Sequence, residues 1–262
     1  MPRPLPPEIL DLIVGHLRDE QSTLRACCFI SKSWVPRTRR ELFSNIKFLS
    51  SKSHIELWTK TFPDPSNSPA HYTRSLTIRG LPIIPASDPG AGCWIQAFRN
   101  VVHLDLENAP WTDHQVSLAP FHGLSPAVRS LRMTATPSKV FDLVCSFPLL
   151  EDLALSSMRP AGGAVGWSVP LASPKLTGSL NLMTVGETQS IARQLLDLPD
   201  GLHFANITVL CLDKDLKSTN DLVSRCSGTL ESLTICYSFM GVFPPASLID
   251  EFLTAARGCS GT

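Results

Sequence analysis

The sequence lacks the features of a secreted, membrane-spanning or strongly charged protein. It has no net charge, because its 262 residues include 23 basic and 23 acidic ones, and this balance argues against a general nucleic-acid or anionic-membrane surface. No apolar run reaches the ~18 residues of a membrane span. The N-terminus lacks the basic region and the apolar run that a signal peptide has. We therefore expect an intracellular protein with no nucleic-acid partner and no membrane partner.

Cysteine pairs with C-x-x-C spacing are also missing. The eight cysteines stand singly or as the adjacent pair Cys27-Cys28, within apolar segments, and no C-x-x-C occurs. Cysteines in this setting behave as small hydrophobic residues in a reducing compartment. We expect no disulfide and no metal site from them.

The common catalytic motifs are absent. The sequence has no G-x-S-x-G and no H-E-x-x-H, and no Lys-Ser/Thr follows the glycines at 162–166, so these do not form a phosphate loop. His103, Asp105 and Glu107 alternate and so share one face of a strand, but a metal site would need ligands converging from other strands. We predict a protein that is not an enzyme and holds no metal or cofactor.

The composition is that of a folded protein with a small module ahead of a larger domain. Hydrophobic residues make up 43% and charged residues 18%, which excludes disorder along most of the chain. Residues 1–60 carry ten Lys and Arg against six Asp and Glu, so this end is mildly basic and suits an acidic partner. We predict one domain at 1–44 and a second at 45–262.

Residues 5–43 predict three short helices. Pro6 and Pro7 suit an opening helical turn, and apolar residues follow at helical spacing: Ile9, Leu10, Ile13 and Leu17. Leu12 and Val14 add a second apolar side, so this helix exposes more apolar surface than a lone small bundle buries. Ser22 and Ser33 are predicted to cap the second helix, carrying Leu24, Ala26, Cys27 and Phe29, and the third, with Pro36 in its first turn.

This segment resembles the F-box. The resemblance lies in Leu5-Pro6-Pro7-Glu8-Ile9-Leu10, then Leu17, Leu24, Cys28, Ile30, Ser31-Lys32-Ser33 and Trp34. It implies docking on a Skp-type adaptor of a cullin-RING ubiquitin ligase, while the rest of the chain recruits a target protein. The implied adaptor-binding residues are Leu5, Pro6, Ile9, Leu10, Ile13, Leu17, Leu24, Cys28, Ile30 and Trp34. The alternative is a helical cap on the domain that follows.

The rest of the chain repeats an L-x-L pattern after helical stretches, at intervals of 22 to 30 residues. The copies are Ile46/Phe48, Leu76/Ile78, Leu104/Leu106, Leu131/Met133, Leu153/Leu155, Leu180/Leu182, Leu210/Leu212 and Leu233/Ile235. The pattern is that of an irregular leucine-rich repeat, similar to those that follow F-boxes in many fungal-type proteins. Its units stack into a solenoid because none buries its apolar face alone.

The predicted fold class is therefore α/β: a small all-α module of three helices, then an irregular solenoid of short parallel strands and helices. A doubly wound α/β sheet is the alternative. It is disfavoured because these strands are short and alternate apolar with polar residues, whereas a sheet covered on both faces is apolar throughout.

Two segments rich in Pro and Gly, 81–92 and 159–170, interrupt the repeats. Trp167 in the second is a candidate partner contact, and the alternative, which is favoured, is that it packs back onto the solenoid. The last predicted helix carries Leu248, Ile249, Phe252 and Leu253, and no strand follows it. A solenoid needs a capping unit, so we expect that the repeat array ends abruptly or is truncated there.

The middle residue of each L-x-L strand should face the concave surface: Thr77, Asp105, Arg132, Ala154, Asn181, Cys211 and Thr234. We predict that the target binds at the most charged part of this face. The candidate target-binding residues, with Trp167 included, are Thr77, His103, Asp105, Glu107, Arg132 and Trp167. Alternatively, Asp105 and Arg132 simply pair with each other. The function that follows is a substrate-recognition subunit of an SCF-type ligase, bound to adaptor and cullin scaffold. A repeat scaffold without a ligase role is the alternative.

Overall fold

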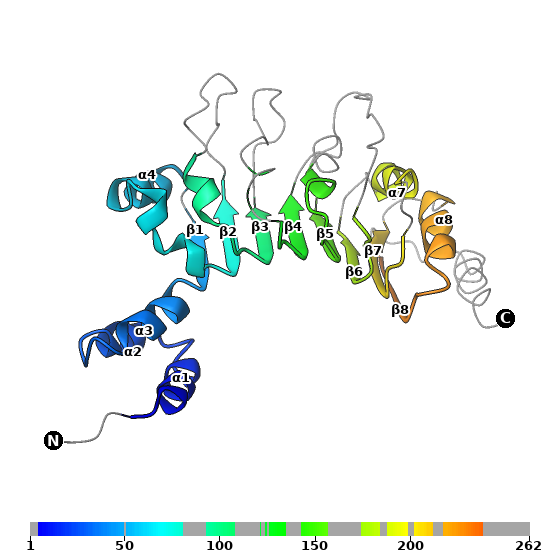
Figure 1. The fold of residues 1–262 in the computed structure, drawn as a ribbon. Helices are drawn as coiled ribbons and strands as arrows, with labels where there is room; N and C mark the ends of the chain where they lie inside the picture. The colour runs from blue at the N-terminus through cyan, green and yellow to red at the C-terminus, as the bar shows by residue number, and fades with distance from the viewer. Residues whose placement is uncertain are drawn as a thin grey trace.

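Three short helices precede an eight-stranded, all-parallel sheet whose strands lie side by side in chain order, β1 to β8 (Figure 1). The computed structural model describes residues 5–49, 51–80, 93–107, 121, 124, 126–134, 143–156, 174–183, 188–198, 202–211 and 217–237. A doubly wound sheet reverses its strand order at a switch point, and this sheet does not. The α/β class and the solenoid of stacked repeats are confirmed.

The helical unit consists of α1 (Pro7–His16), α2 (Gln21–Cys27) and α3 (Val35–Leu42). Its interior is formed by Leu10, Val14, Leu24, Cys27 and Thr38, all buried. Pro7 and Pro36 occupy first turns, as the sequence predicts, because a missing N–H costs nothing there.

The predicted serine caps are wrong. The N-cap of α2 is Glu20, and the N-cap of α3 is Trp34, neither with a side-chain capping bond. Ser22 lies inside the first turn of α2. Ser33 lies one residue before the N-cap of α3, and its hydroxyl forms a hydrogen bond with the Ser31 hydroxyl at 2.7 Å.

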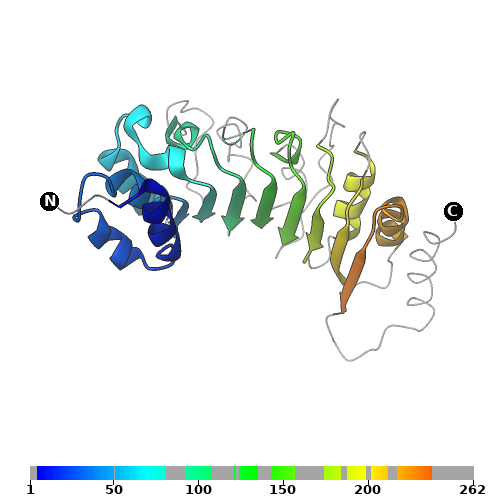
Figure 2. The same cartoon turned by 60° about the horizontal axis from the view of Figure 1, so that its bottom comes forward.

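The helices that the structure describes in the solenoid lie on one side of the sheet (Figures 1 and 2). Its elements are β1 (Asn45–Phe48), α4 (Ser51–Thr61), η1 (Pro65–Asn67), η2 (Pro69–Tyr72), β2 (Ser75–Arg79), η3 (Cys93–Ala97), β3 (His103–Glu107), β4 (Ser130–Thr134), β5 (Asp152–Ser156), β6 (Ser179–Leu182), α7 (Thr188–Leu196), β7 (Asn206–Cys211), α8 (Lys217–Arg225) and β8 (Ser232–Tyr237). Residues Leu143 and Val144 are also helical. The helical element between β2 and β3 is the short 3-10 helix η3.

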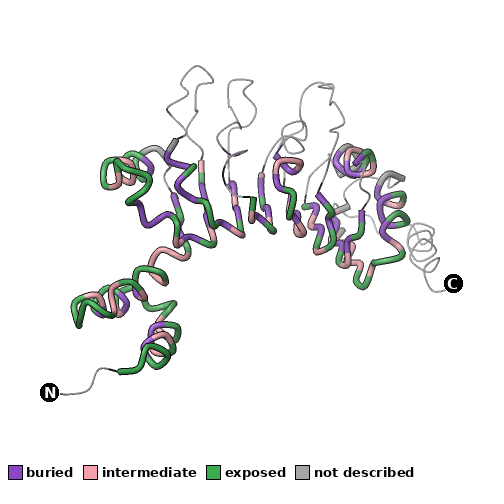
Figure 3. Tube along the Cα trace, viewed as in Figure 1, coloured by how far each residue is buried: buried purple, intermediate pink, exposed green. Residues whose placement is uncertain are grey.

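One face of the sheet forms the core, which appears as buried residues along the whole row of strands (Figure 3). Alternate strand residues such as Leu104 and Leu106 are buried, and they pack with residues of the helical side such as Ile95, Leu195 and Val223. The opposite positions of the strands are mostly exposed or half-buried. This alternation is what a sheet covered on one face requires.

Backbone hydrogen bonds connect each repeat to the next at the strand entrances. The carbonyl of the residue just before a strand accepts two N–H groups from the equivalent point of the next repeat; Ser44, Arg74, Val102, Arg129, Gly178 and Ala205 all act in this way. At Glu151 the carbonyl accepts one, from Gly178, and the Asp152 carboxylate accepts the other, from Ser179 at 2.6 Å.

The predicted seventh repeat is out of register. In the sheet, Leu180 and Leu182 are paired with Ile207 and Val209, and these continue to Leu233 and Ile235. The inward pair is thus Ile207/Val209 and not Leu210/Leu212, and the outward residue is Thr208 and not Cys211. The L-x-L pattern was ambiguous here because β7 is apolar over most of its length. The corrected spacing between repeats is more even.

Several predictions concern residues outside those described: the segments 81–92 and 159–170, Trp167, and the last helix with Leu248 and Phe252. In the part of the chain that is described, no helix has the length and apolarity to cross a membrane. No group of His, Cys, Asp and Glu in that part is arranged to hold a metal ion.

Candidate partner-binding surfaces

The helical unit exposes large apolar side chains. On the α1 side Leu5, Ile9 and Leu12 are 50%, 43% and 59% exposed, and in the turn after α2 Phe29 and Ile30 are 90% and 62% exposed. Ile9 and Leu12 lie three residues apart and so share one face of α1. A unit this small has little reason to leave five such side chains in water unless another molecule covers them.

The predicted adaptor-binding residues divide by burial. Leu5, Pro6, Ile9 and Ile30 are exposed; Ile13, Leu17, Cys28 and Trp34 are half-buried; Leu10 and Leu24 are buried. The last two therefore support the unit from inside and offer no surface to a partner.

Sequence reasoning placed Leu12 and Val14 on a second apolar side of the first helix but named neither Leu12 nor Phe29 as an adaptor-binding residue, and Val14 is in fact buried. The signal for Leu12 is its place three residues after Ile9. The signal for Phe29 is its place next to Ile30, beyond the end of α2 at Cys27.

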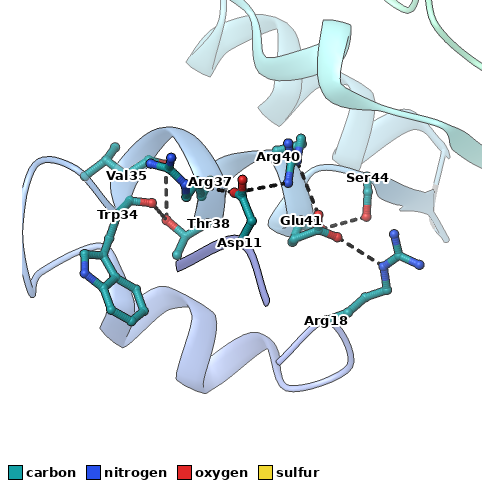
Figure 4. A network of polar contacts seen from close by, with 9 residues as sticks. All are labelled: Asp11, Arg18, Trp34, Val35, Arg37, Thr38, Arg40, Glu41 and Ser44. Carbon is teal, nitrogen blue, oxygen red and sulfur yellow. Dashed lines mark hydrogen bonds and ion pairs between the residues drawn. The ribbon is translucent and has the colours of Figure 1, made fainter. Parts of the chain in front are cut away.

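Ion pairs hold α1 against α3 (Figure 4). Asp11 on α1 lies 2.8 Å from the Arg37 guanidinium and 3.6 Å from that of Arg40. Arg18, just after α1, lies 3.1 Å from Glu41. Arg37 and Arg40 of α3 thus connect this helix to α1.

The helical unit is also joined to the first repeat. The Phe43 ring meets the Trp58 ring edge-on, with centroids 6.3 Å apart. The Thr73 hydroxyl donates to the Phe43 carbonyl at 2.9 Å, and the Ser44 carbonyl accepts from the N–H groups of Arg74 and Ser75. The unit therefore continues the end of the solenoid at β1, as Figure 1 shows.

The exposed face of the sheet brings most predicted target-binding residues together. Thr77, Asp105 and Arg132 occupy one row across β2, β3 and β4. Arg132 lies 3.9 Å from Asp105, and on the same face Arg79 lies 3.7 Å from Glu107. Thr77 is 9% exposed. The charges of this patch therefore largely compensate one another.

Asp105 has an unfavourable environment for its charge. Burial, and then the neighbouring Glu107 carboxylate, raise the pKa of Asp105 above its ordinary value of 3.8, while Arg132 and Lys47 act in the opposite direction. One carboxylate oxygen, Oδ1, is buried without a hydrogen-bond partner in the described structure. The carboxylate is thus only partly compensated by Arg132.

No protein-family model matches this sequence, and no curated protein matches it.

Proposed function

We propose that this chain is the substrate-recognition subunit of an SCF-type ubiquitin ligase. The unit α1–α3 acts as an F-box and docks on a Skp-type adaptor, which links it to the cullin scaffold. The solenoid holds a protein target. The chain supplies no catalytic residue, because ubiquitin transfer is carried out by the attached ligase.

The observation that carries this proposal is the exposed apolar set Leu5, Ile9, Leu12, Phe29 and Ile30 on a unit whose sequence resembles an F-box. Complete burial of one such side chain contributes about 2 kcal/mol. Several together supply the apolar centre that a specific interface needs.

The junction with the solenoid supports a receptor role. The Phe43–Trp58 contact and the bonds to the Ser44 carbonyl limit rotation of the helical unit against β1. A target held by the solenoid would then have a defined orientation to the adaptor, and such positioning is what a receptor contributes to transfer.

The test is co-elution of the purified chain with a Skp-type adaptor. The variant Ile9→Ala/Phe29→Ala should lose about 2 kcal/mol or more of binding free energy, the scale of an interface hot spot. Leu57→Ala is the matched control, since Leu57 is a 63% exposed leucine on α4, outside the helical unit. Circular dichroism reports whether each variant remains folded.

Full adaptor binding by folded Ile9→Ala/Phe29→Ala and by folded Leu5→Ala/Pro6→Ala would overturn the assignment. The same conclusion follows if the unmodified chain does not bind the adaptor.

A repeat scaffold without a ligase role is the second candidate. It is favoured by the packing of Phe43 on Trp58, because a plain end cap would make the same contact. Truncation at residue 44 does not separate the two functions, since it would also uncover Trp58. The point variants do separate them, because they leave the contact with Trp58 intact.

A further inference from the structure

A polar cavity of about 610 Å³ lies where the helical unit meets the sheet. Its walls come from the turn after α1, the end of α3, and the entrances of β1, β2 and β3. The ionisable side chains that line it are Arg18, Asp19, Glu41, Lys47, Arg74 and His103. The volume is within the range of ligand-binding pockets.

The cavity holds cations that the protein does not pair. Within the described structure, the side chains of Lys47, Arg74 and His103 form no hydrogen bond and no ion pair, although Lys47 lies near enough to Asp105 to favour its charged form. Arg18, by contrast, is paired with Glu41 at 3.1 Å. The cavity therefore differs from the neighbouring patch at Asp105 and Arg132, where the charges pair with each other.

The balance of charge limits what the cavity can bind. Glu41 is compensated by Arg18 and by Arg40, and its side chain is only 9% exposed. Asp19 is the other carboxylate among the lining residues, and the two remaining cations are Lys47 and Arg74. The lining residues therefore carry a surplus of one positive charge, with His103 counted as neutral and Asp105, which lies outside the lining, not counted.

We propose that this junction cavity binds an aspartate or glutamate side chain of an extended peptide segment. A carboxylate brings one negative charge, which matches the surplus, and the Asn45 amide and Ser75 hydroxyl in the cavity wall can donate to its oxygens. A phosphorylated side chain brings nearly two charges, and Asp19 and Glu41 would repel the excess. The proposal rests on the proposed function, and it names an acidic segment as the part of the target held beside the adaptor-binding unit.

The test uses the purified full chain and fluorescent peptides. One peptide alternates glutamate with serine, a second has glutamine in place of glutamate, and a third has phosphoserine in place of glutamate. Fluorescence anisotropy at low and moderate salt gives the affinities. We expect the glutamate peptide to bind more tightly than the other two, with an affinity that falls as salt is added.

The variant Lys47→Gln/Arg74→Gln should weaken binding of the glutamate peptide by about fivefold, as expected for the loss of two partly exposed charge contacts. Lys60→Gln/Arg225→Gln is the matched control, because it also removes one lysine and one arginine, both exposed and away from the cavity lining. Its affinity should equal that of the unmodified chain.

Four results would overturn the proposal: no binding of the glutamate peptide, equal binding of the glutamine peptide, tighter binding of the phosphoserine peptide, or equal losses in both double variants. Adaptor co-elution is measured on the same variants. Lost peptide binding with intact adaptor binding would overturn only this inference. Peptide binding without any adaptor binding would overturn the ligase function and leave a peptide-binding solenoid.

Discussion

At the residue scale, Asp105 shows how the exposed face of the sheet tolerates an imperfectly compensated charge. Its side chain is 23% exposed and lies 3.9 Å from Arg132. Burial still dominates and raises the pKa of the carboxyl group. A raised pKa means that the folded state binds the proton more tightly than the unfolded state, so ionisation of Asp105 opposes folding.

We therefore expect Asp105→Asn to unfold at neutral pH with a free energy equal to or above that of the unmodified chain. The difference in unfolding free energy between this variant and the unmodified chain should be largest above the raised pKa of Asp105. It should disappear as the pH falls below the ordinary pKa of 3.8, where Asp105 is protonated in both the folded and the unfolded state. Urea titrations over a pH series measure it. Arg132→Gln is the comparison, since it removes a favourable neighbour and should lower stability at neutral pH. A large loss of stability in Asp105→Asn at neutral pH would contradict the prediction.

Gly178 leaves space for a bond between repeats. A β-carbon at this position would collide with Oδ1 of Asp152, the oxygen that accepts from the Ser179 N–H. Gly178→Ala should therefore cost about 2 kcal/mol of unfolding free energy, the scale of a hydrogen bond to a charged group. Gly228→Ala is the control, since nothing lies within 4 Å of a β-carbon there. Equal stabilities of the two variants, measured in urea, would show that Asp152 moves away without cost.

At the element scale, β7 is the strand whose inward residues the L-x-L pattern left ambiguous. Ile207 and Val209 are buried and continue the inward rows of β6 and β8, whereas Leu210 is half-buried. The first residue of each strand separates the alternatives, because it is polar in every repeat: Asn45, Ser75, His103, Ser130, Asp152, Ser179, Asn206 and Ser232.

Ile207→Ala should destabilise the chain by about 3 kcal/mol, because it removes buried methyl groups and leaves a cavity. Leu210→Ala should cost about 1 kcal/mol or less, since its side chain is not in the buried row. Thermal and urea unfolding of the two variants decide between the registers. A larger loss for Leu210→Ala would restore the register predicted from the L-x-L pattern.

At the scale of the whole molecule, the helical unit and the exposed face of the sheet are separate surfaces on one connected body (Figures 1 and 3). Under the proposed function, this arrangement would allow target capture to change without a change in adaptor binding. Glu107→Lys/Arg132→Glu reverses the charges of the patch while it preserves the net charge. We expect a different set of captured proteins and an unchanged amount of adaptor, both read by mass spectrometry after a pull-down.

Asp221→Lys/Arg225→Glu is the control for that pull-down, because it reverses one acidic and one basic residue on α8, both exposed. If Glu107→Lys/Arg132→Glu captures the same proteins as the unmodified chain, the target does not bind at this patch. The junction cavity and the segment around Trp167 would then be tested next.

The sequence by itself determined the elements and their succession: three helices, then short strands at a recurring spacing. These features are local, because alternation such as Leu104-Asp105-Leu106 reports which side of a strand is buried. Repeat stacking then follows, since a single unit cannot bury its apolar face. Of the candidate site, the exposure of Leu5, Ile9 and Ile30 agrees with the surface role that the F-box resemblance implies for them.

Only the tertiary structure decided which residues meet. Leu10 and Leu24 are buried while Leu12 and Phe29 are exposed, because the packing of α1, α2 and α3 selects the inner face of helices that are apolar on more than one side. The junction cavity joins residues as distant in sequence as Arg18 and His103. Local periodicity has no information on such convergence, since it depends on how the helical unit sits against the stacked strands.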